Sequence, residues 1–314
     1  MNRQQGSGVR DQGSDKRDQT SEKRDRERLR LAVLFAFAFL FVLQLQAANP
    51  PEWTSPFPPF RIAGNLYYVG SEDLAAYLIT TPQGNILINS NLESSPALIK
   101  QSIEKLGFHF RDTKILLISH GHFDHCAGSA EIVKETGAKY YVMDADVPVV
   151  EAGGRNDFHY AKQKDFWFPP QHVDHVLHDG DTVALGGTVL TARKTAGHTK
   201  GTITWTLDEN ENGKTLHVVI VGSPNVNPGY KLVGNPTYPQ IADDYRHGFQ
   251  VLKSLPCDIF LGAHGGYFGM KAKYERWKAG DHDAFIDPKG YKEYIADREQ
   301  AFEAEYQKQL SLRH

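Results

Sequence analysis

The most informative segment of this chain is Ser119-His120-Gly121-His122-Phe123-Asp124-His125-Cys126-Ala127-Gly128. Just before it, residues 114–119 read KILLIS, an apolar run typical of a buried strand. Three imidazoles and one carboxylate therefore follow a strand end within six residues, on a loop that glycine allows to bend. This donor mixture suits a zinc-like ion, since calcium and magnesium prefer sites built from oxygen alone. The spacing predicts a metal site at this strand end.

Two further histidines occupy similar positions later in the chain. His198 lies in Thr195-Ala196-Gly197-His198-Thr199, after a strand predicted to end near Ala192, and His264 follows a strand predicted at residues 258–261. Loops held at strand ends are where rigid scaffolds commonly present functional side chains. We therefore expect both histidines to join the metal site. The nine histidines outside these three segments, of 14 in all, lack such a setting, and among them only His159 is a pocket candidate.

Short strands alternate with amphipathic helices through the rest of the chain. Residues 77–80 and 85–88 flank Pro82-Gln83-Gly84 and predict a hairpin, and Ser95-Pro96 opens a helix that ends at Gly107. Further strands are predicted at residues 140–143, 182–185, 189–192, 203–207 and 218–221, with a turn at 209–213, and further helices at 241–254 and 291–310. No linker rich in Pro, Gly or Ser divides them. The pattern predicts a single α/β domain.

Composition excludes several other classes of protein. The 314 residues are 40% hydrophobic and 23% charged, which is typical of a folded globular protein. The net charge of −3 gives no reason to expect a nucleic-acid partner. Two cysteines are too few for a disulfide scaffold or for a zinc site of four thiolates.

The N-terminal region has the pattern of a secretory signal. Residues 1–30 carry nine basic and six acidic side chains, and residues 31–43 read LAVLFAFAFLFVL without a charge. This run is short for a bilayer span of about 20 residues but suits the apolar part of a signal peptide. Ala47-Ala48 then provides a small-residue cleavage site. We predict a signal peptide at residues 1–47 with a long basic head, and a mature domain at 48–314; the alternative is an uncleaved membrane anchor.

The histidine pattern resembles a known family. His120-Gly121-His122-Phe123-Asp124-His125, with Gly197-His198 and His264, is similar to the HxHxDH signature of the metallo-β-lactamase superfamily, and more narrowly to subclass B3. The resemblance runs from about residue 60 to His264 and beyond, and includes residues 60–70, 154–159, 227–230 and 238–239. It implies a four-layer αβ/βα sandwich: two mixed sheets face each other between outer helices, with the metals at one edge.

The residues after the predicted strand 218–221 separate the branches of this superfamily. Glyoxalase II, lactonases and tRNA-processing nucleases place a metal-bridging Asp there, and subclasses B1 and B2 place a Cys, whereas this chain has Gly222-Ser223. The B3 pattern remains, with His125 as a ligand of the second ion. The resemblance thus implies two zinc ions per chain, the first held by His120, His122 and His198 and the second by Asp124, His125 and His264.

Two positions depart from the family pattern. Many members carry an Asp where this chain has Asn89, and that carboxylate supports a metal ligand through a hydrogen bond; Asn can accept the bond but brings no charge. B3 enzymes often pair a cysteine matching Cys257 with one near Ile220, which is absent here, so we expect no such disulfide. Cys126, beside His125, is predicted to be a small buried apolar residue and not a ligand.

The ligand types define a hydrolytic mechanism. Three neutral imidazoles leave zinc most of its charge, enough to lower the pKa of a bound water from about 15.7 toward about 7. The resemblance implies that the metal-bound hydroxide, held by Asp124 as catalytic residue, attacks the β-lactam carbonyl without a covalent enzyme intermediate. Ser223 and Asn225 are expected to bind the substrate carboxylate, the alternative being ordinary polar loop residues. Phe158, Tyr160, Phe166 and Trp167 are candidates for the pocket wall, or for the core.

The predicted protein is therefore a β-lactamase, a hydrolase of cyclic amides, that confers resistance to penicillins, cephalosporins and carbapenems. We expect it to be a monomer in the periplasm. We expect it to bind no nucleic acid and to have no stable membrane association after signal cleavage. The main alternative is another hydrolase of the same fold, a lactonase or thioesterase, against which the missing bridging Asp argues. A flavo-diiron-like redox enzyme would need more carboxylates and a flavin domain. A non-catalytic metal-binding relative is disfavoured because all six ligands are present.

Overall fold

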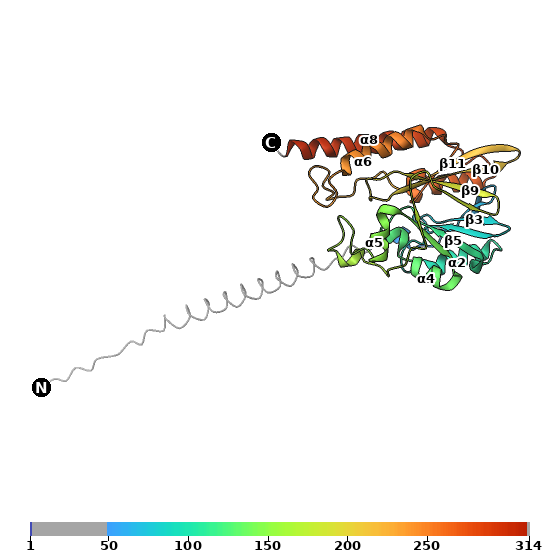
Figure 1. Ribbon diagram of the computed structural model, residues 1–314, viewed down its shortest axis with the longest axis horizontal. Coiled ribbons are helices and arrows are strands. Elements are labelled where there is room, and N and C mark those ends of the chain that lie inside the picture. Colours follow the sequence, from blue (N-terminus) through green and yellow to red (C-terminus); the bar gives the residue numbers. More distant parts are fainter. Residues whose placement is uncertain (2–48, 313–314) are drawn as a thin grey trace. The chain divides into compact units, whose positions relative to one another are not determined.

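Two mixed β-sheets dominate the computed structural model, which describes residue 1 and residues 49–312 (Figure 1). In the seven-stranded sheet, neighbours follow the chain from β1 to β7; β1 to β4 are antiparallel, and β4 to β7 are parallel. Its strands are β1 (Phe60–Ala63), β2 (Leu66–Tyr68), β3 (Tyr77–Thr81), β4 (Gly84–Ile88), β5 (Thr113–Leu117), β6 (Lys139–Met143) and β7 (His175–Leu177).

The second sheet has five strands in the order β12-β11-β10-β9-β8. Its neighbours are antiparallel except for β11 and β12, which run parallel. Its strands are β8 (Thr182–Leu185), β9 (Thr188–Lys194), β10 (Ile203–Glu211), β11 (Lys214–Val221) and β12 (Ile259–Gly262).

Helices cover the outer face of each sheet, which gives four layers (Figure 1). Helices α2 (Pro96–Lys105) and α4 (Ser129–Thr136) lie against the seven-stranded sheet, and α6 (Ile241–Ser254) and α8 (Pro288–Ser311) against the five-stranded one. Shorter helices are α3 (Phe123–Cys126), α5 (Val147–Glu151) and α7 (Met270–Lys278). Single 3-10 turns occupy Pro51–Trp53, Phe110–Asp112, Asp144–Asp146, Lys164–Phe166 and Gly265–Phe268.

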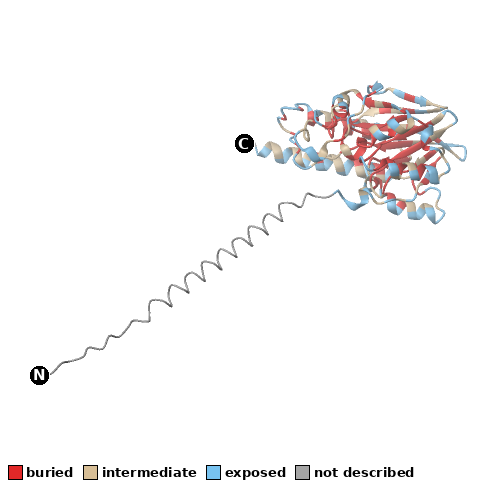
Figure 2. Cartoon of the chain, turned by 90° about the horizontal axis from the view of Figure 1, so that it is seen from below, coloured by how far each residue is buried: buried red, intermediate tan, exposed pale blue. Residues whose placement is uncertain are grey.

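Continuous apolar runs in its strands explain why the seven-stranded sheet is buried on both faces. Along β4, Ile86 and Ile88 enter the core between the sheets, whereas Leu87 packs with Ile99 and Ile103 of α2 on the other face. Neighbouring side chains on a strand point to opposite faces, so a continuous apolar run fits a strand covered on both sides. Buried residues accordingly concentrate in the strands, and exposed ones on the outer helix surfaces (Figure 2).

The two sheets are joined by hydrogen bonds at the end of β5. Ile203 N, at the start of β10, donates to Ser119 O over 2.8 Å, and the Trp205 indole donates to Ile118 O over 3.1 Å. Trp205 is fully buried. The loop that carries the histidine motif therefore starts at a point fixed from both sheets.

The fold expected from the sequence is confirmed, including the hairpin of β3 and β4 and the long C-terminal helix. The turn predicted at residues 209–213 is wrong in extent. Strand β10 continues to Glu211, and β11 begins at Lys214. The tight turn between them consists of Asn212 and Gly213, which both have positive φ. Such a two-residue turn matches the twist of the strands it connects, so the polar residues 208–211 stay in the sheet.

The predicted signal peptide, residues 1–47, lies outside the described residues apart from Met1. The chain from Pro51 onward forms one compact unit, to which the description above applies. Within residues 49–312, no helix combines the length and the apolar character needed to cross a membrane.

Candidate metal centre

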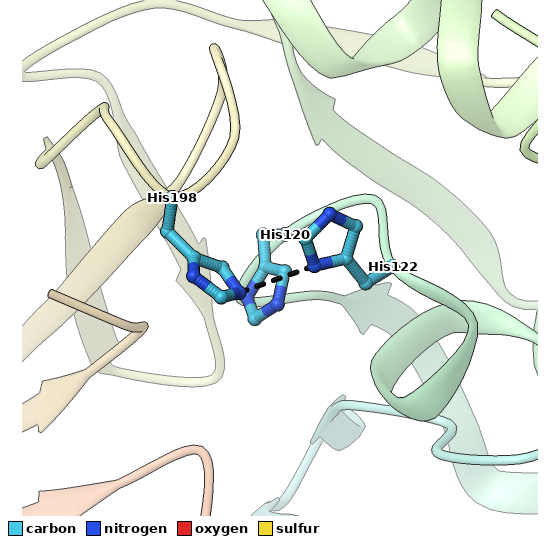
Figure 3. Close-up of side chains that lie close together, drawn as sticks. All are labelled: His120, His122 and His198. Atoms are coloured by element: carbon cyan, nitrogen blue, oxygen red, sulfur yellow. Dashed lines mark hydrogen bonds between the residues drawn. The ribbon is translucent and has the colours of Figure 1, made fainter. Parts of the chain in front are cut away.

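The loop after β5 turns the side chains of His120 and His122 toward His198, which comes from the loop after β9 (Figure 3). One ring nitrogen of each of the three lies within 4.8 Å of the others. His122 Nδ1 and His198 Nε2 are 3.1 Å apart. All three histidines are buried. The three residues predicted for a first metal ion thus converge, although 76 positions separate the last two in the chain.

The orientation of the His198 ring is fixed by the main chain of Asn225. Its Nδ1 donates to the main-chain oxygen of Asn225 over 2.8 Å, which leaves the Nε2 lone pair directed at the other histidines. The preceding Gly197 has φ +133°, and a Cβ there would lie 2.6 Å from the Tyr245 ring. Glycine is therefore required for the sharp approach of the loop to helix α6.

Asp124, His125 and His120 form a second donor set, whose ligand atoms also lie within 4.8 Å of one another. His264, from the end of β12, approaches the same set. Its Nε2 is 3.5 Å from Asp124 Oδ2, which in turn is 3.3 Å from His125 Nε2. The predicted second group therefore also comes together, with His120 between the two sets.

Asp73 fixes the orientation of His264 and was missed by sequence reasoning. Its Oδ2 lies 2.9 Å from His264 Nδ1, and its Oδ1 accepts from Gly266 N over 2.9 Å. A proton on Nδ1 leaves Nε2 as the coordinating atom, directed at Asp124. The only sequence signal was an acidic residue in a short loop, since Asp73 and His264 are 191 positions apart.

Electrostatics favour the metal-binding forms of His120, His198 and Asp124, whereas neighbouring acidic groups raise the pKa of His122 and of His264. Burial, reinforced by neighbouring histidines, holds the pKa of His120 well below its usual value and lowers the pKa of His198 to about 3. Burial alone would raise the pKa of Asp124, but His125 and His264 hold it well below its usual range. At neutral pH this leaves His120 and His198 neutral and Asp124 ionised, which is the state that coordinates a cation, while at His122 and His264 a cation would compete with a proton.

Unpaired ring nitrogens are a second observation that fits a bound metal ion. His120 Nε2 and His125 Nδ1 are buried and have no hydrogen-bond partner. An unpaired buried polar atom is costly, so a cation that accepts these lone pairs would remove the penalty. Four or more imidazoles with one carboxylate match the preferences of zinc and not those of calcium or magnesium.

Asp146, also missed from the sequence, joins the two loops that carry the first three histidines. Its side chain is buried and accepts hydrogen bonds from Gly121 N over 2.8 Å, Thr199 Oγ1 over 2.7 Å and Gly201 N over 2.9 Å. Burial raises the pKa of Asp146, opposed by these donors. The carboxylate thereby fixes the distance between the His120–His122 loop and the His198 loop.

The predicted substrate-binding residues border the centre. Ser223 Oγ lies 3.2 Å from the Tyr267 hydroxyl and accepts from Asn225 N over 3.4 Å. Asn225 also has a role that the sequence did not reveal, because its main-chain oxygen holds His198 and accepts from the Tyr245 hydroxyl. A Cβ on Gly222 would lie 2.2 Å from Ile203 O, so this position could not hold an Asp without a main-chain shift.

Asn89 acts on the main chain and not on a ligand side chain, contrary to expectation. Its Oδ1 accepts from Ser119 N over 2.8 Å, and its Nδ2 donates to Ala75 O over 3.2 Å. The ring of His120 is instead contacted by Ser119 Oγ, 3.1 Å from Nδ1. Asn89 has φ +67°, a conformation that Asn tolerates better than most residues.

Aromatic side chains contact the histidines of the metal centre. The Tyr160 ring is 5.3 Å from the His122 ring and stacks on Phe166. That these two side chains form a pocket wall stays a prediction. Trp53, which the sequence did not single out, lies 5.7 Å from the His264 ring. Phe158 packs instead on Tyr230 and Tyr238. Both cysteines are free, and Cys126 is buried, as predicted.

Comparisons with known proteins agree with this geometry. A family model described as the metallo-beta-lactamase superfamily matches residues 74–264. The native metallo-beta-lactamase FEZ-1 from Legionella gormanii is 59% identical, with 81% of this chain and 97% of that chain covered and a TM-score of 0.81. BJP-1, a subclass B3 metallo-beta-lactamase of Bradyrhizobium japonicum, is 38% identical, with 84% and 99% covered and a TM-score of 0.78.

A curated relative is more distant. A UPF0173 metal-dependent hydrolase of Anaeromyxobacter dehalogenans (strain 2CP-C) is 30% identical over 208 residues, which make up 63% of this chain and 65% of that protein. The chain therefore spans slightly less than two thirds of the length of this relative.

Proposed function

The chain belongs to the metallo-beta-lactamase superfamily, and from this membership we propose that it is a zinc-dependent hydrolase that opens the ring of β-lactam antibiotics. The observation that carries the proposal is the meeting of two donor sets, His120 with His122 and His198, and His120 with Asp124 and His125. The 59% identity to a metallo-beta-lactamase along almost its full length supports the choice of β-lactams over other substrates.

Two zinc ions would be held as the B3 pattern implies. His120, His122 and His198 would hold the first, and Asp124, His125 and His264 the second. The imidazole-rich donors, the low pKa of His198 and the unpaired nitrogens of His120 and His125 all support this assignment. Zinc, when bound, supplies Lewis acidity and a water that is deprotonated near neutral pH.

The protein's own residues orient the reaction. Asp124 remains ionised because of His125 and His264, so its carboxylate can accept a hydrogen bond from the attacking water and direct it. Asp73 holds His264, and Asn225 O holds His198, so neither ring has to reorganise during the reaction. Ser223 and the Asn225 side chain would bind the substrate carboxylate at the border of the site.

No protein nucleophile is needed for this reaction. Cys126 Sγ donates to His122 O over 3.0 Å, and burial raises its pKa well above the usual value, so the thiolate is disfavoured. The side-chain hydrogen-bond partner of Ser223 among the described residues is the hydroxyl of Tyr267 and not an imidazole. Water would therefore attack directly, without a covalent enzyme intermediate.

We also propose export to the periplasm, with cleavage near Ala47 or Ala48 and a monomeric mature domain from residue 48. The support is the basic head, the apolar run at 31–43 and the small residues that follow it. N-terminal sequencing of periplasmic material would begin near residue 48. Full-length protein that sediments with membranes would instead favour the anchor.

Hydrolysis of a chromogenic cephalosporin by the purified protein, with and without a chelator, tests the activity. We expect turnover that the chelator abolishes and that added zinc restores. Chelator-sensitive hydrolysis of a lactone or a thioester, with no turnover of the cephalosporin, would overturn the proposal in favour of the alternative hydrolase.

A further inference from the structure

A cavity of about 860 Å³ adjoins the metal centre between residues 225–229 and helix α8. Asn225 and Tyr267 stand at its border with the centre. The main-chain oxygen of Asn225 accepts from His198, and the Tyr267 ring lies 5.0 Å from the His264 ring. Asn225 and Tyr267 therefore connect the cavity to His198 and His264, and Tyr267 also lies 3.2 Å from Ser223 Oγ.

Arg298 of α8 lines this cavity and contacts Asn225. Its Nη1 donates to Asn225 Oδ1 over 3.4 Å, and its guanidinium lies 6.0 Å from the centre of the Tyr294 ring. Asp297, the carboxylate that pairs with it, is exposed and does not line the cavity. Nε and Nη2 of Arg298 both donate to that carboxylate, which leaves Nη1, the nitrogen that contacts Asn225, to attract an anion inside the cavity.

The second lining cation, Lys308, is balanced within the cavity wall. Its Nζ lies 2.9 Å from Glu305, which also lines the cavity. Tyr267, Tyr294 and Pro228 provide the flat apolar surface around these charges. The lining thus combines aromatic walls with one cation, Arg298, whose carboxylate partner is not part of the lining.

We propose that this cavity takes the substituent on the β-lactam ring system that carries the carboxylate, and that Arg298 selects acidic groups at that position. The inference rests on the proposed function. Asn225 contacts Ser223 through its N–H and Arg298 of the cavity through its side chain. If Ser223 and Asn225 bind the substrate carboxylate, the neighbouring substituent on the same ring therefore lies at the cavity. An acidic substituent would then pair with the guanidinium, whereas a quaternary ammonium group would be repelled.

The test compares three cephalosporins that share one acylamino side chain and differ only in the 3-substituent: a carboxylate, a methyl group and a quaternary ammonium. The variants are Arg298→Gln, Arg298→Lys and, as control, Lys289→Gln, which removes a charge from the exposed start of the same helix, where Lys289 pairs with Glu293. Melting temperature and bound zinc are measured for each variant, since a change in either would indicate a structural effect.

We expect Arg298→Gln to lower kcat/KM for the carboxylate substrate about three- to fivefold, mainly through KM, with less than about a twofold change for the methyl substrate. Arg298→Lys should recover part of the loss, and the control should leave all three substrates unchanged. An equal effect of Arg298→Gln on all three substrates overturns this inference alone. If the zinc-loaded wild-type protein hydrolyses none of them, the proposed function fails and this inference fails with it.

Discussion

Thr199, the residue after His198, donates its hydroxyl hydrogen to the buried carboxylate of Asp146 over 2.7 Å. The same carboxylate accepts from Gly121 N, between the first two histidines of the motif. Two loops from different sheets are therefore tied to a single side chain at the end of β6. The spacing of the three imidazoles depends on this tie, since no hydrogen bond other than that of His122 with His198 joins their rings directly among the described residues.

Asp146→Asn should weaken metal binding without touching a ligand. The amide replaces one acceptor oxygen with a donor, which leaves a buried N–H or hydroxyl unpaired. We expect about 1–3 kcal/mol less stability and about 10- to 100-fold weaker zinc binding, measured by urea unfolding and chelator competition. The control is Asp144→Asn, two residues earlier, whose carboxylate pairs with Lys194 and is partly exposed. Zinc affinities that match between the two variants would contradict this role of Asp146.

His264→Ala should reduce bound zinc from two ions to one. His264 approaches Asp124 but none of the three residues assigned to the first ion, so the loss should be confined to the second site. Elemental analysis after equilibration with zinc measures the stoichiometry, and His217→Ala, at an exposed position beside Asp208, serves as control. The assignment of two ions is wrong if the unaltered protein never exceeds one zinc under saturating metal.

Asp73→Asn should weaken the second site selectively. Burial opposes ionisation of Asp73, but His264 and the Gly266 N–H lower its pKa, so the carboxylate is charged at neutral pH. Its loss removes the group that fixes the His264 proton on Nδ1, and we expect the second zinc to bind about 10- to 100-fold more weakly while the first is unchanged. Glu72→Gln, the adjacent carboxylate that pairs with Lys271, is the matched control. Titration with a zinc indicator resolves the two steps, and equal weakening of both ions would argue against a specific effect on His264.

Glu209 should make the protein less stable as pH rises. Its side chain is 5% exposed, and burial raises its pKa to about 7 from 4.5. Between these values the native state binds more protons than the unfolded chain, so stability falls with increasing pH through this window and the cost is complete above pH 7. Glu209→Gln should therefore stabilise the metal-free protein at pH 8 by up to about 3 kcal/mol, and much less at pH 4.5.

The matched control for this change is Glu211→Gln. Glu211 accepts from Gly64 N and pairs with Arg61, and these contacts lower its pKa, so its charge stabilises the native state at pH 8. The two variants should shift the free energy of unfolding at pH 8 in opposite directions. Urea unfolding of the metal-free proteins at pH 4.5, 6 and 8 measures the difference. A Glu209→Gln variant with the same pH dependence as the wild type would refute the raised pKa.

Local sequence patterns predicted much of this molecule. The hairpin of β3 and β4 follows from apolar runs on either side of a Pro-Gln-Gly turn, and the candidate ligands follow from residue types that few other sites require. Asp73 and Asp146 could not be found in this way. Each acts on residues far away in the sequence, and an acidic residue in a loop is in most proteins simply solvated. The main-chain oxygen of Asn225 left no sequence signal, since every residue has one.

The last prediction separates the roles of Asp124 and Ser223 through kinetics. Asp124→Asn keeps the size of the side chain but removes the charge that lies 3.3 Å from His125 Nε2 and 3.5 Å from His264 Nε2. One preorganised electrostatic contact is worth about 3 kcal/mol in the transition state, so kcat should fall by about 100-fold or more. Ser223→Ala should instead raise KM about tenfold with little change in kcat, because a bond to the substrate carboxylate acts equally before and during the reaction.

Tyr267→Phe provides the control for Ser223, because it removes the hydroxyl that pairs with Ser223 Oγ while leaving the serine in place. If Ser223 binds the substrate, this variant should raise KM less than Ser223→Ala does. If Ser223 only holds Tyr267, the two variants should have the same effect. Steady-state hydrolysis of a penicillin and a cephalosporin by the zinc-loaded variants gives kcat and KM separately. Negligible effects of both Asp124→Asn and Ser223→Ala on β-lactam turnover, with rapid hydrolysis of a thioester or lactone by the wild type, would place this chain with the other hydrolases of its fold.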